Sequence, residues 1–147
     1  MNEHRAIEVW VDWQGLVGAR KLGMLFATPS RDKEIFSFEY DKAWLESGFH
    51  RELDPELRLH RGVQYSAGSR SNFGLFLDSS PDRWGRVLMR RREALLALTE
   101  DRAERRLVES DYLLGVHDGH RMGALRFRTG DVFRQYRAAP IAAVFSR

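Results

Sequence analysis

Two closely spaced histidines are a pair of residues whose types and spacing could support chemistry. His117 and His120 lie three residues apart, with Asp118 and Gly119 between them. Two imidazoles and a carboxylate in one turn could share a metal ion, although a closed tetrahedral site would take a further ligand from elsewhere in the chain. Because glycine and aspartate favour a solvated turn, we expect no metal site at this point.

The other patterns that mark catalytic and nucleotide-binding sites are missing from the sequence. Gly15 and Gly18 lack the third glycine and the following helix of a dinucleotide-binding fingerprint, and no Gly-Lys-Ser/Thr triplet occurs. Ser69 follows Gly68 but has no second glycine where a serine elbow requires one. No cysteine is present to act as a thiol nucleophile. The sequence therefore predicts no catalytic, cofactor-binding or metal-binding residue, and we expect the chain alone to be inactive.

A cluster of arginines could bind a ligand through charge. Five arginines lie between residues 83 and 92 without an acidic residue among them, and Arg83, Arg86 and Arg90 share one side of the expected helix. Such a stripe could hold the phosphates of a nucleic acid. It could also be a solvated helix face, balanced by the acidic residues that follow it. A third interpretation is a protein-contact face, since Arg91 falls within the apolar stripe of the same helix.

The composition limits the functions that these residues can serve. The chain has 147 residues and a formal net charge of +3, with 21 arginines among its 24 basic residues. The length fits one domain, and the net charge is too small to indicate a dedicated nucleic-acid surface unless it is clustered. The apolar run over 138–145 is far too short for a membrane span. Residues 1–5 lead into a strand rather than a signal-peptide core, so we expect a cytoplasmic protein without a membrane partner.

The elements that must position these residues begin with a sheet. Alternating apolar and polar residues predict three antiparallel strands, at 7–11, 16–26 and 36–40. Turn-forming residues over 28–33 predict a loop before the third strand. Asp41 is expected to cap a short helix that ends at Ser47. The strands over about 7–40 therefore predict an N-terminal antiparallel β-sheet or small barrel.

A helical segment is expected to follow the sheet and to complete an α+β fold. It occupies about residues 73–116, after a polar surface loop over 62–72, and a closing strand is expected near 123–128. Ser80 is expected to cap the main helix, with proline and aspartate in its first turn. The stripe of this helix expected to face the core consists of Trp84, Leu88, Leu95 and Leu98. Two further helices are expected, over 99–109 and 110–114.

Three parts of the chain have the residue pattern of a known family. Residues 73–86 read FGLFLDSSPDRWGR, and residues 111–116 and 121–125 read DYLLGV and RMGAL. They resemble the central F-x-x-L-P-x-G/S segment of HipA-like proteins and the short helix and Gly-Ala strand that close their N-terminal subdomain. The first stretch departs from the family at 78–80, where many members have Leu-Leu-Pro. The remaining part lies at the start of the chain and comprises 9–11 with Gly18, and 36–40 with Trp44-Leu45. It is similar to the family's F-x-Y-x-x-x-W-L opening.

HipA-like proteins are serine/threonine kinase toxins of bacterial type II toxin–antitoxin modules. They phosphorylate a translation component and are neutralised by a small helix-turn-helix, DNA-binding antitoxin. The resemblance covers about residues 7–128. It implies that 1–130 form the N-terminal subdomain and that 131–147 form a tail at the point where the kinase core would follow. ATP, Mg²⁺ and the catalytic residues would belong to that core, so the resemblance transfers none of them to this chain.

The resemblance implies a surface for partners. These would be a HipA-like kinase core, in cis or in trans, and a HipB-like helix-turn-helix antitoxin, which would bring association with DNA indirectly. The expected interface residues are Ser80, Arg83, Trp84, Arg86, Arg90, Arg121 and Met122. The ordinary alternatives are that Trp84 anchors the core and that Met122 fills a gap. Without its partner, the subdomain would expose apolar surface and could form a homodimer.

Three other functions stay open at this point. The chain could be a free-standing split subdomain that regulates a separate HipA-like kinase. It could be a small nucleic-acid-binding module that uses the Arg83–Arg92 helix, in which case binding to duplex DNA would depend steeply on salt. It could be an intact small enzyme, for which ATP turnover by the chain alone would be the test.

Overall fold

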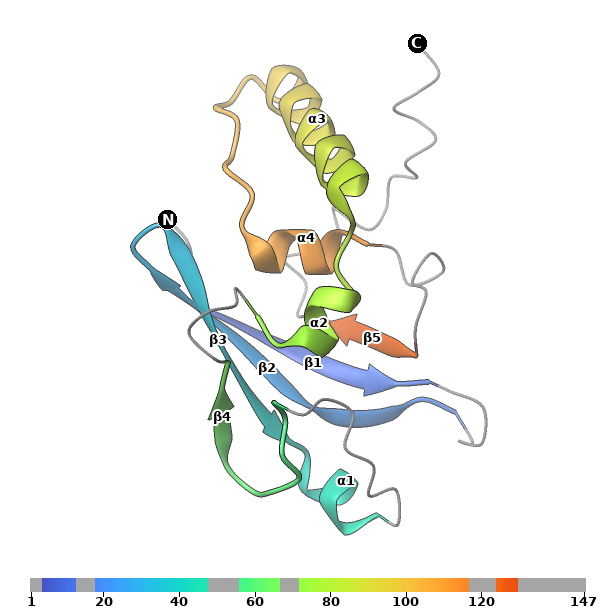
Figure 1. The fold of residues 1–147 in the computed structure, drawn as a ribbon. Helices are drawn as coiled ribbons and strands as arrows, with labels where there is room; N and C mark the ends of the chain where they lie inside the picture. Colours follow the sequence, from blue (N-terminus) through green and yellow to red (C-terminus); the bar gives the residue numbers. More distant parts are fainter. Residues whose placement is uncertain (1–3, 13–17, 48–55, 67–71, 117–123, 130–147) are drawn as a thin grey trace.

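An open antiparallel sheet forms one layer of the computed structural model, and helices cover one of its faces (Figure 1). The structure describes residues 4–12, 18–47, 56–66, 72–116 and 124–129. Its strands are β1 (Arg5–Val11), β2 (Arg20–Ser30), β3 (Lys33–Tyr40), β4 (Val63–Tyr65) and β5 (Leu125–Arg128). They follow the order β4-β3-β2-β1-β5, so the described strands do not close into a barrel. The α+β prediction is confirmed, and the sheet is the correct one of the two forms expected for the N-terminal part.

The first three strands form an antiparallel meander whose alternation matches the sequence pattern. In β1 the side chains of Ile7, Val9 and Val11 are fully buried, while those between them are partly exposed. Ile7 pairs with Leu25 across the ladder to β2, and the register shifts between Val9 and Trp10. The predicted antiparallel pairing of the first two strands is therefore confirmed; of the turn residues that the sequence offers between them at 12–15, all but Asp12 lie outside the described residues.

The predicted loop over 28–33 is mostly strand. Strand β2 continues to Ser30 and β3 starts at Lys33, which leaves a turn of only Arg31 and Asp32. Arg31 has a φ of 51°, the left-handed backbone that such a tight turn uses. Pro29 is tolerated within β2 because the ladder to β1 runs no further than Ala27, so its missing N–H costs no bond on that side.

A second correction concerns the polar loop expected over 62–72. Val63–Tyr65 form the short edge strand β4, which pairs with β3. Gln64 is buried, and its side chain accepts a hydrogen bond from the Arg58 backbone N at 2.9 Å and donates one to the Arg58 carbonyl at 2.6 Å. Three residues alternate too briefly to mark a strand in the sequence, and the tertiary pairing supplies what the pattern lacks.

The helix expected after Asp41 is present as α1 (Lys42–Glu46). The Asp41 carboxylate accepts a hydrogen bond from the Ala43 backbone N at 3.2 Å. At the other end of the helix, the Ser47 backbone N–H donates to the Ala43 carbonyl. Trp44 is the buried residue of this helix. Both predicted ends of α1 are therefore confirmed.

Aromatic side chains connect the sheet to the helices. Helix α2 (Gly74–Asp78) carries Phe76, whose ring centroid lies 5.4 Å from that of Phe38 and 6.0 Å from that of Phe127. Phe73 meets the same ring edge-on at 5.8 Å. The fully buried hydrophobic residues of this core are Ile7, Val9, Val11, Leu22, Leu25, Ala27, Phe36, Phe38, Leu57, Phe73, Phe76, Leu113 and Phe127.

The main helix starts two residues later in the chain than the expected Ser80 cap would place it. Helix α3 (Arg83–Thr99) is capped by Asp82, whose carboxylate accepts a hydrogen bond from the Gly85 backbone N at 2.8 Å. Ser80 is not the cap, because its hydroxyl donates to the Phe76 carbonyl at the end of α2. An ionised aspartate satisfies the positive end of the helix better than a serine hydroxyl does.

The helix expected over 99–109 does not form. Residues 100–107 return from the end of α3 without regular structure, and the next helix is α4 (Glu109–Gly115). Asp111 accepts a hydrogen bond from the Val108 backbone N at 2.9 Å and so closes the first turn of α4. The short helix expected over 110–114 is therefore confirmed, with a start one residue earlier.

The predicted core face of α3 is wrong. Trp84, Leu95 and Leu98 are 61%, 50% and 79% exposed, whereas Glu93 and Ala97 are the buried residues of the helix. Trp84 is therefore not a core anchor. Figure 1 shows the reason: α3 rises away from the sheet and lies beside α4, not over the sheet. The apolar stripe was correctly identified, but it faces outward.

Candidate functional site

Helix α3 is held to the rest of the molecule by its polar face. The Arg86 guanidinium donates two hydrogen bonds to the Glu109 carboxylate, at 2.8 and 3.0 Å. Its central carbon lies 4.6 Å from the centroid of the Tyr112 ring, and Arg90 donates to the Tyr112 hydroxyl at 3.4 Å. Two of the expected interface arginines are therefore engaged within the chain, where they fix α3 on α4.

The pairing of Arg86 has an electrostatic signature. The hydrogen bond that Arg86 donates to Glu109 raises the pKa of Arg86, and this effect outweighs the lowering that partial burial causes. A bidentate guanidinium–carboxylate ion pair is among the stronger polar contacts in proteins because both hydrogen bonds are charge-assisted. Arg86 therefore orients α3 and presents less of its charge to an outside ligand.

Glu93 fixes the segment that returns from the end of α3. Its carboxylate is fully buried and accepts hydrogen bonds from the Arg102 guanidinium at 2.6 and 3.3 Å. It also accepts a hydrogen bond from the Arg105 backbone N at 3.0 Å. The hydrogen bonds that Arg102 donates, first to Glu93 and second to Glu100, raise the pKa of Arg102. This network explains why residues 100–107 do not continue as a helix: their donors bind a carboxylate on α3.

A further polar network ties α4 to the sheet. The Glu34 carboxylate on β3 accepts hydrogen bonds from the Ser110 backbone N at 2.8 Å and from its hydroxyl at 2.7 Å. Asp111 pairs with Arg5 of β1 at 2.8 Å and with Arg105 at 3.1 Å. The position of α3 is therefore set by a continuous set of contacts from the sheet through α4.

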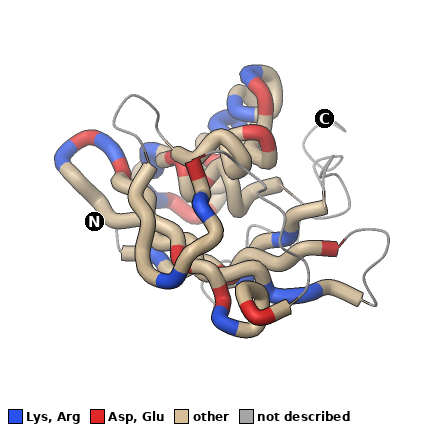
Figure 2. Tube along the Cα trace, turned by 60° about the horizontal axis from the view of Figure 1, so that its bottom comes forward, with Lys and Arg blue, Asp and Glu red and all other residues tan. Residues whose placement is uncertain are grey.

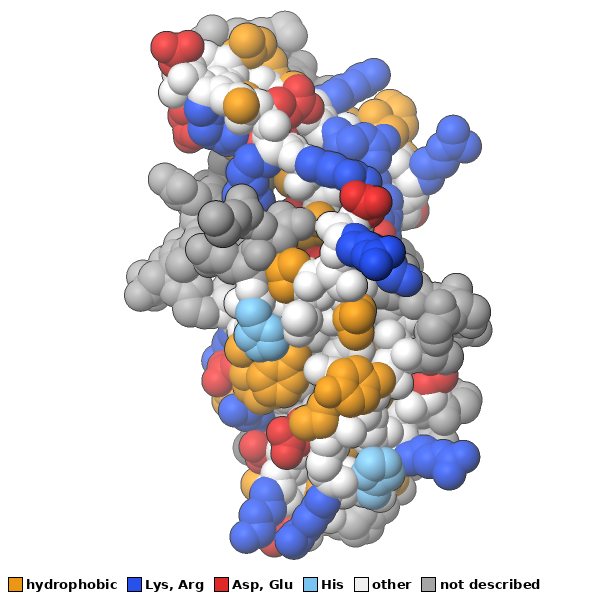
Figure 3. Space-filling view, turned by 90° about the vertical axis from the view of Figure 1, so that its left-hand side faces the viewer, with side chains coloured by type: hydrophobic (Ala, Val, Ile, Leu, Met, Phe, Trp, Pro, Cys, Tyr) orange, Lys and Arg blue, Asp and Glu red, His pale blue; other side chains and the backbone are white. Residues whose placement is uncertain are grey.

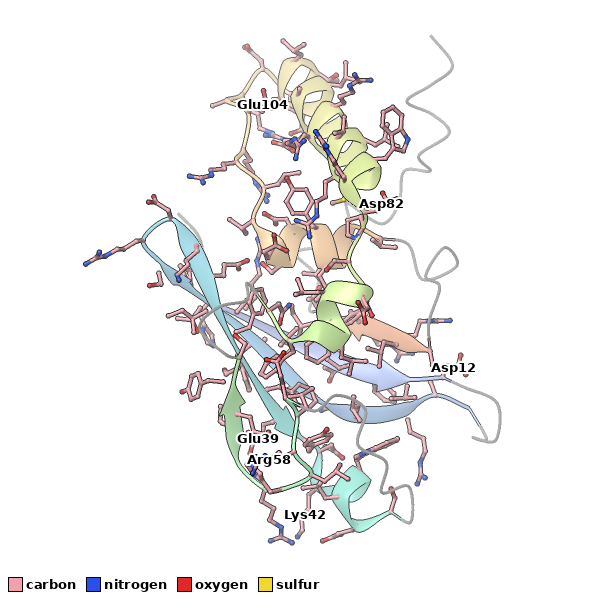
Figure 4. The ribbon with its side chains drawn as sticks, viewed as in Figure 1. Asp12, Glu39, Lys42, Arg58, Asp82 and Glu104 are labelled. Atoms are coloured by element: carbon pink, nitrogen blue, oxygen red, sulfur yellow. The ribbon has the colours of Figure 1, made fainter. Side chains whose placement is uncertain are left out.

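The face of α3 that points away from these contacts is apolar and exposed. We call it the outer seam, and its residues are Trp84, Leu88, Arg91, Leu95 and Leu98. Their spacing of four, three, four and three residues keeps them on one side of a helix. Leu88 is half-buried and Arg91 is exposed. In Figure 4, Asp82 marks the start of α3 and Glu104 the segment that returns from its end.

The charges around α3 do not form a continuous basic surface. Arg83 is exposed at the first position of the helix, while Arg86 and Arg90 contact α4. Figure 2 shows acidic positions interrupting the basic ones in the helical part. The structure therefore separates the predicted arginine stripe into residues that hold the fold and residues that face solvent.

A second exposed apolar patch lies on the outer face of the sheet and was not predicted. Ile35, Val63 and Tyr65 are 44%, 46% and 70% exposed. Phe26 lies on the same face, with its ring stacked on His4 at 6.0 Å between centroids. Figure 3 shows hydrophobic side chains gathered beside a histidine over the sheet. The signal that could have found this patch is β3 itself, where Ile35 and Phe36 are consecutive and so must occupy opposite faces.

The remaining candidates fall outside the described residues. Arg121 and Met122, and the pair His117 and His120, belong to the range 117–123. Within the described part of the chain, no group of three His, Asp or Glu residues is arranged to hold a metal ion. Among the same residues, no helix is long and apolar enough to cross a membrane.

The outer seam is therefore the candidate site that combines one expected interface residue, Trp84, with exposed apolar area. A comparison of the chain with protein-family models, with curated proteins and with solved structures found no match.

Proposed function

We propose that the chain is a non-catalytic docking subdomain, the N-terminal subdomain of a HipA-like serine/threonine kinase. Its role is to pack on the kinase core, in cis or in trans, and to offer a surface to a helix-turn-helix antitoxin. The observation that carries the proposal is the outer seam of α3, which exposes Trp84, Leu95 and Leu98 while the opposite face is fixed to α4. The residue pattern of 73–86 and of the closing segment supports the choice of family.

The seam is suited to binding protein because it is both apolar and rigidly positioned. Burying a tryptophan or leucine side chain contributes about 1.5–3 kcal/mol. Three such side chains can offset much of the free energy lost when two proteins associate. Because α3 is held by the Arg86–Glu109 contact, little further order has to be imposed on binding. Tryptophan and arginine are also the residues that most often dominate protein interfaces.

The nucleic-acid alternative receives less support from the same helix. A phosphate-binding stripe needs guanidinium groups that are available to the ligand. Arg86 and Arg90 lie on the side that contacts α4, and Arg86 already neutralises Glu109. The exposed residues of the seam are mainly apolar, which favours a protein partner.

The proposal is tested by complex formation with named partners. The chain is mixed with a purified HipA-like kinase core and, separately, with a HipB-like antitoxin from the same genome, and binding is measured by calorimetry. We expect a complex with at least one of them, and an affinity at least about tenfold lower for Leu98→Glu, since a carboxylate would then be buried at the interface.

The matched control is Tyr65→Glu, which places the same charge on an exposed apolar residue of the sheet, 70% exposed against 79% for Leu98. It is expected to bind like the unchanged chain. Failure to bind either partner would contradict the proposal. An equal loss in both variants would place the interface somewhere other than α3.

A further inference from the structure

We propose that the partner element that binds the outer seam is an α-helix with a carboxylate positioned opposite Arg91. This inference rests on the proposed function, because it assigns an occupant to the same face of α3. It adds the shape of that occupant and the chemical group that it must carry. Neither follows from the exposure of the seam alone.

The spacing of the seam indicates a helix as the occupant. Trp84, Leu88, Arg91, Leu95 and Leu98 repeat every three or four residues, the 3.5-residue period with which two helices pack side by side. They span 15 residues of α3, about 21 Å at the rise of an α-helix. A straight seam of this length presents one row of side chains to a second helix, with the i, i+3, i+4 and i+7 spacing by which amphipathic helices are recognised.

The positions beside the seam allow a second helix to approach closely. Gly85, Val87, Arg92 and Ala94 flank it on α3; three of them are small or medium-sized residues without charge, and Arg92 is the charged exception. Small flanking residues let two helix axes come together, whereas long charged ones would separate them. The seam therefore has the period of a helix-packing surface, and on the side of Val87 and Ala94 it also has the small flanking residues of one.

Arg91 determines the charge of the partner. It lies at the midpoint of the seam, with two apolar positions on each side. Among the described residues, none forms a hydrogen bond or an ion pair with its side chain. Its neighbours at three and four residues along the helix are Val87, Leu88, Ala94 and Leu95, and none of them is acidic. A helix that covers the seam would remove water from this cation, which is unfavourable unless a carboxylate pairs with it.

The same position argues against a second copy of the chain as the occupant. Because Arg91 is the midpoint, an in-register pair of α3 helices would bring Arg91 against Arg91 whether the two helices ran parallel or antiparallel. Two like charges buried at one layer of a helix pair are destabilising. The partner is therefore expected to be a different helix, acidic at this one layer.

The chain itself can supply the probe for this inference. In Arg91→Glu, the variant carries the carboxylate that the unchanged seam is expected to select, and in Arg91→Leu the seam becomes apolar throughout. Association is measured by analytical ultracentrifugation of each protein alone and of an equimolar mixture of the unchanged chain with Arg91→Glu. Because Arg91 is exposed, both variants are expected to fold, which circular dichroism confirms.

We expect the mixture to form a one-to-one complex at least about tenfold tighter than the self-association of either component, corresponding to about 1.4 kcal/mol. We expect Arg91→Leu to self-associate at least about tenfold more tightly than the unchanged chain. Added salt should weaken the mixed complex and leave the Arg91→Leu dimer unaffected. Adding Leu98→Glu to Arg91→Leu should abolish its dimer, which places the contact on the seam.

Two results would overturn the inference. If Arg91→Leu associates no better than the unchanged chain, the seam is not a helix-packing surface. If Arg91→Leu dimerises but the mixture gains nothing, Arg91 does not select a carboxylate. These results are separable from the proposed function: binding to a kinase core or antitoxin that is lost in Leu98→Glu but kept in Arg91→Glu would support docking at α3 and reject the acidic helix.

Discussion

Arginine has two different roles on helix α3, and the contacts of individual side chains distinguish them. Arg86 donates to Glu109 through both terminal nitrogens of its guanidinium and lies over the Tyr112 ring. Arg91, five residues later, faces solvent at the centre of the outer seam. The sequence shows both as members of one basic cluster. The difference depends on which side of the helix meets α4, and that side is decided by tertiary contacts.

The structural role of Arg86 leads to a prediction for Arg86→Lys. Lysine keeps the positive charge but has neither the two-pronged geometry nor the flat group that stacks on Tyr112. We expect the free energy of unfolding to fall by about 1 kcal/mol, since one charge-assisted hydrogen bond is lost. Denaturation in urea measures the change, and Arg83→Lys at an exposed position of the same helix should leave it unaltered.

The raised pKa of Arg86 also sets the pH dependence of this contribution. A group whose pKa is raised on folding stabilises the protein below its unfolded pKa and loses that effect only as the pH rises through the folded one. For an arginine this occurs above about pH 12. The difference between Arg86→Lys and the unchanged chain should therefore stay constant from about pH 6 to about pH 9. A difference that disappears within this range would show that Arg86 is not the group responsible.

The strands were predictable from sequence to the extent that their pattern is local. Alternation identified β1, most of β2 and β3, and the closing strand β5. The ends of β2 and β3 were missed because Thr28 and Pro29 have the composition of a loop, and only the ladder between the two strands makes them extended. The edge strand β4 was missed for the same reason.

The helices show what a periodic pattern cannot specify. The stripe from Trp84 to Leu98 correctly indicated a helix with one apolar side. Periodicity gives no information on which element that side meets, so the assignment of the stripe to the core was wrong. The false helix at 99–109 has a similar origin: the fully buried Glu93 binds donors of Arg102 and Arg105, a competition that local sequence does not reveal.

Close packing between β2 and β3 gives a prediction at the level of the sheet. A Cβ atom added at Gly23 would overlap the backbone oxygen of Glu39 and the ring of Phe38. Backbone cannot move aside as a flexible side chain can, so the two strands would have to separate. We expect Gly23→Ala to lower the free energy of unfolding by about 3 kcal/mol. Thermal unfolding followed by circular dichroism checks this, with Ala6→Ser on the exposed side of β1 as the control that should not change. A stability unchanged in Gly23→Ala would mean that β2 and β3 lie further apart.

For the molecule as a whole, the charge balance predicts weak binding to nucleic acid. The net charge is +3, and two of the clustered arginines are turned towards α4. We expect duplex DNA to bind with a Kd weaker than about 10 µM at physiological salt. The slope of the logarithm of the binding constant against the logarithm of salt concentration should be no steeper than about two. A titration at two salt concentrations measures both quantities. Tighter binding with a steep salt dependence, reduced by Arg83→Ala, would favour the nucleic-acid module over the docking subdomain.

The fold class was predictable from sequence, whereas only part of the candidate site was. The α+β class follows from strands that precede helices, which the alternation of residues 7–11 and 36–40 already indicates. Trp84 and Arg83 were expected at an interface and are exposed. Arg86 and Arg90 were expected there too and instead contact α4, since Glu109 and Tyr112 approach them only in the folded chain. The apolar patch around Tyr65 depends on the pairing of β4 and had no pattern of its own.

The hydrogen bonds between Glu34 and Ser110 join residues 76 positions apart in the chain. The first turn of α4 therefore takes the acceptor for Ser110 from β3, in addition to Asp111 of its own sequence, so α4 gains its full stability only after the early strands are in place. A gene shortened at its start would lose more than its first three strands, because the later helices would lose the carboxylate that anchors them. The sheet and the helices are accordingly expected to unfold as one cooperative unit.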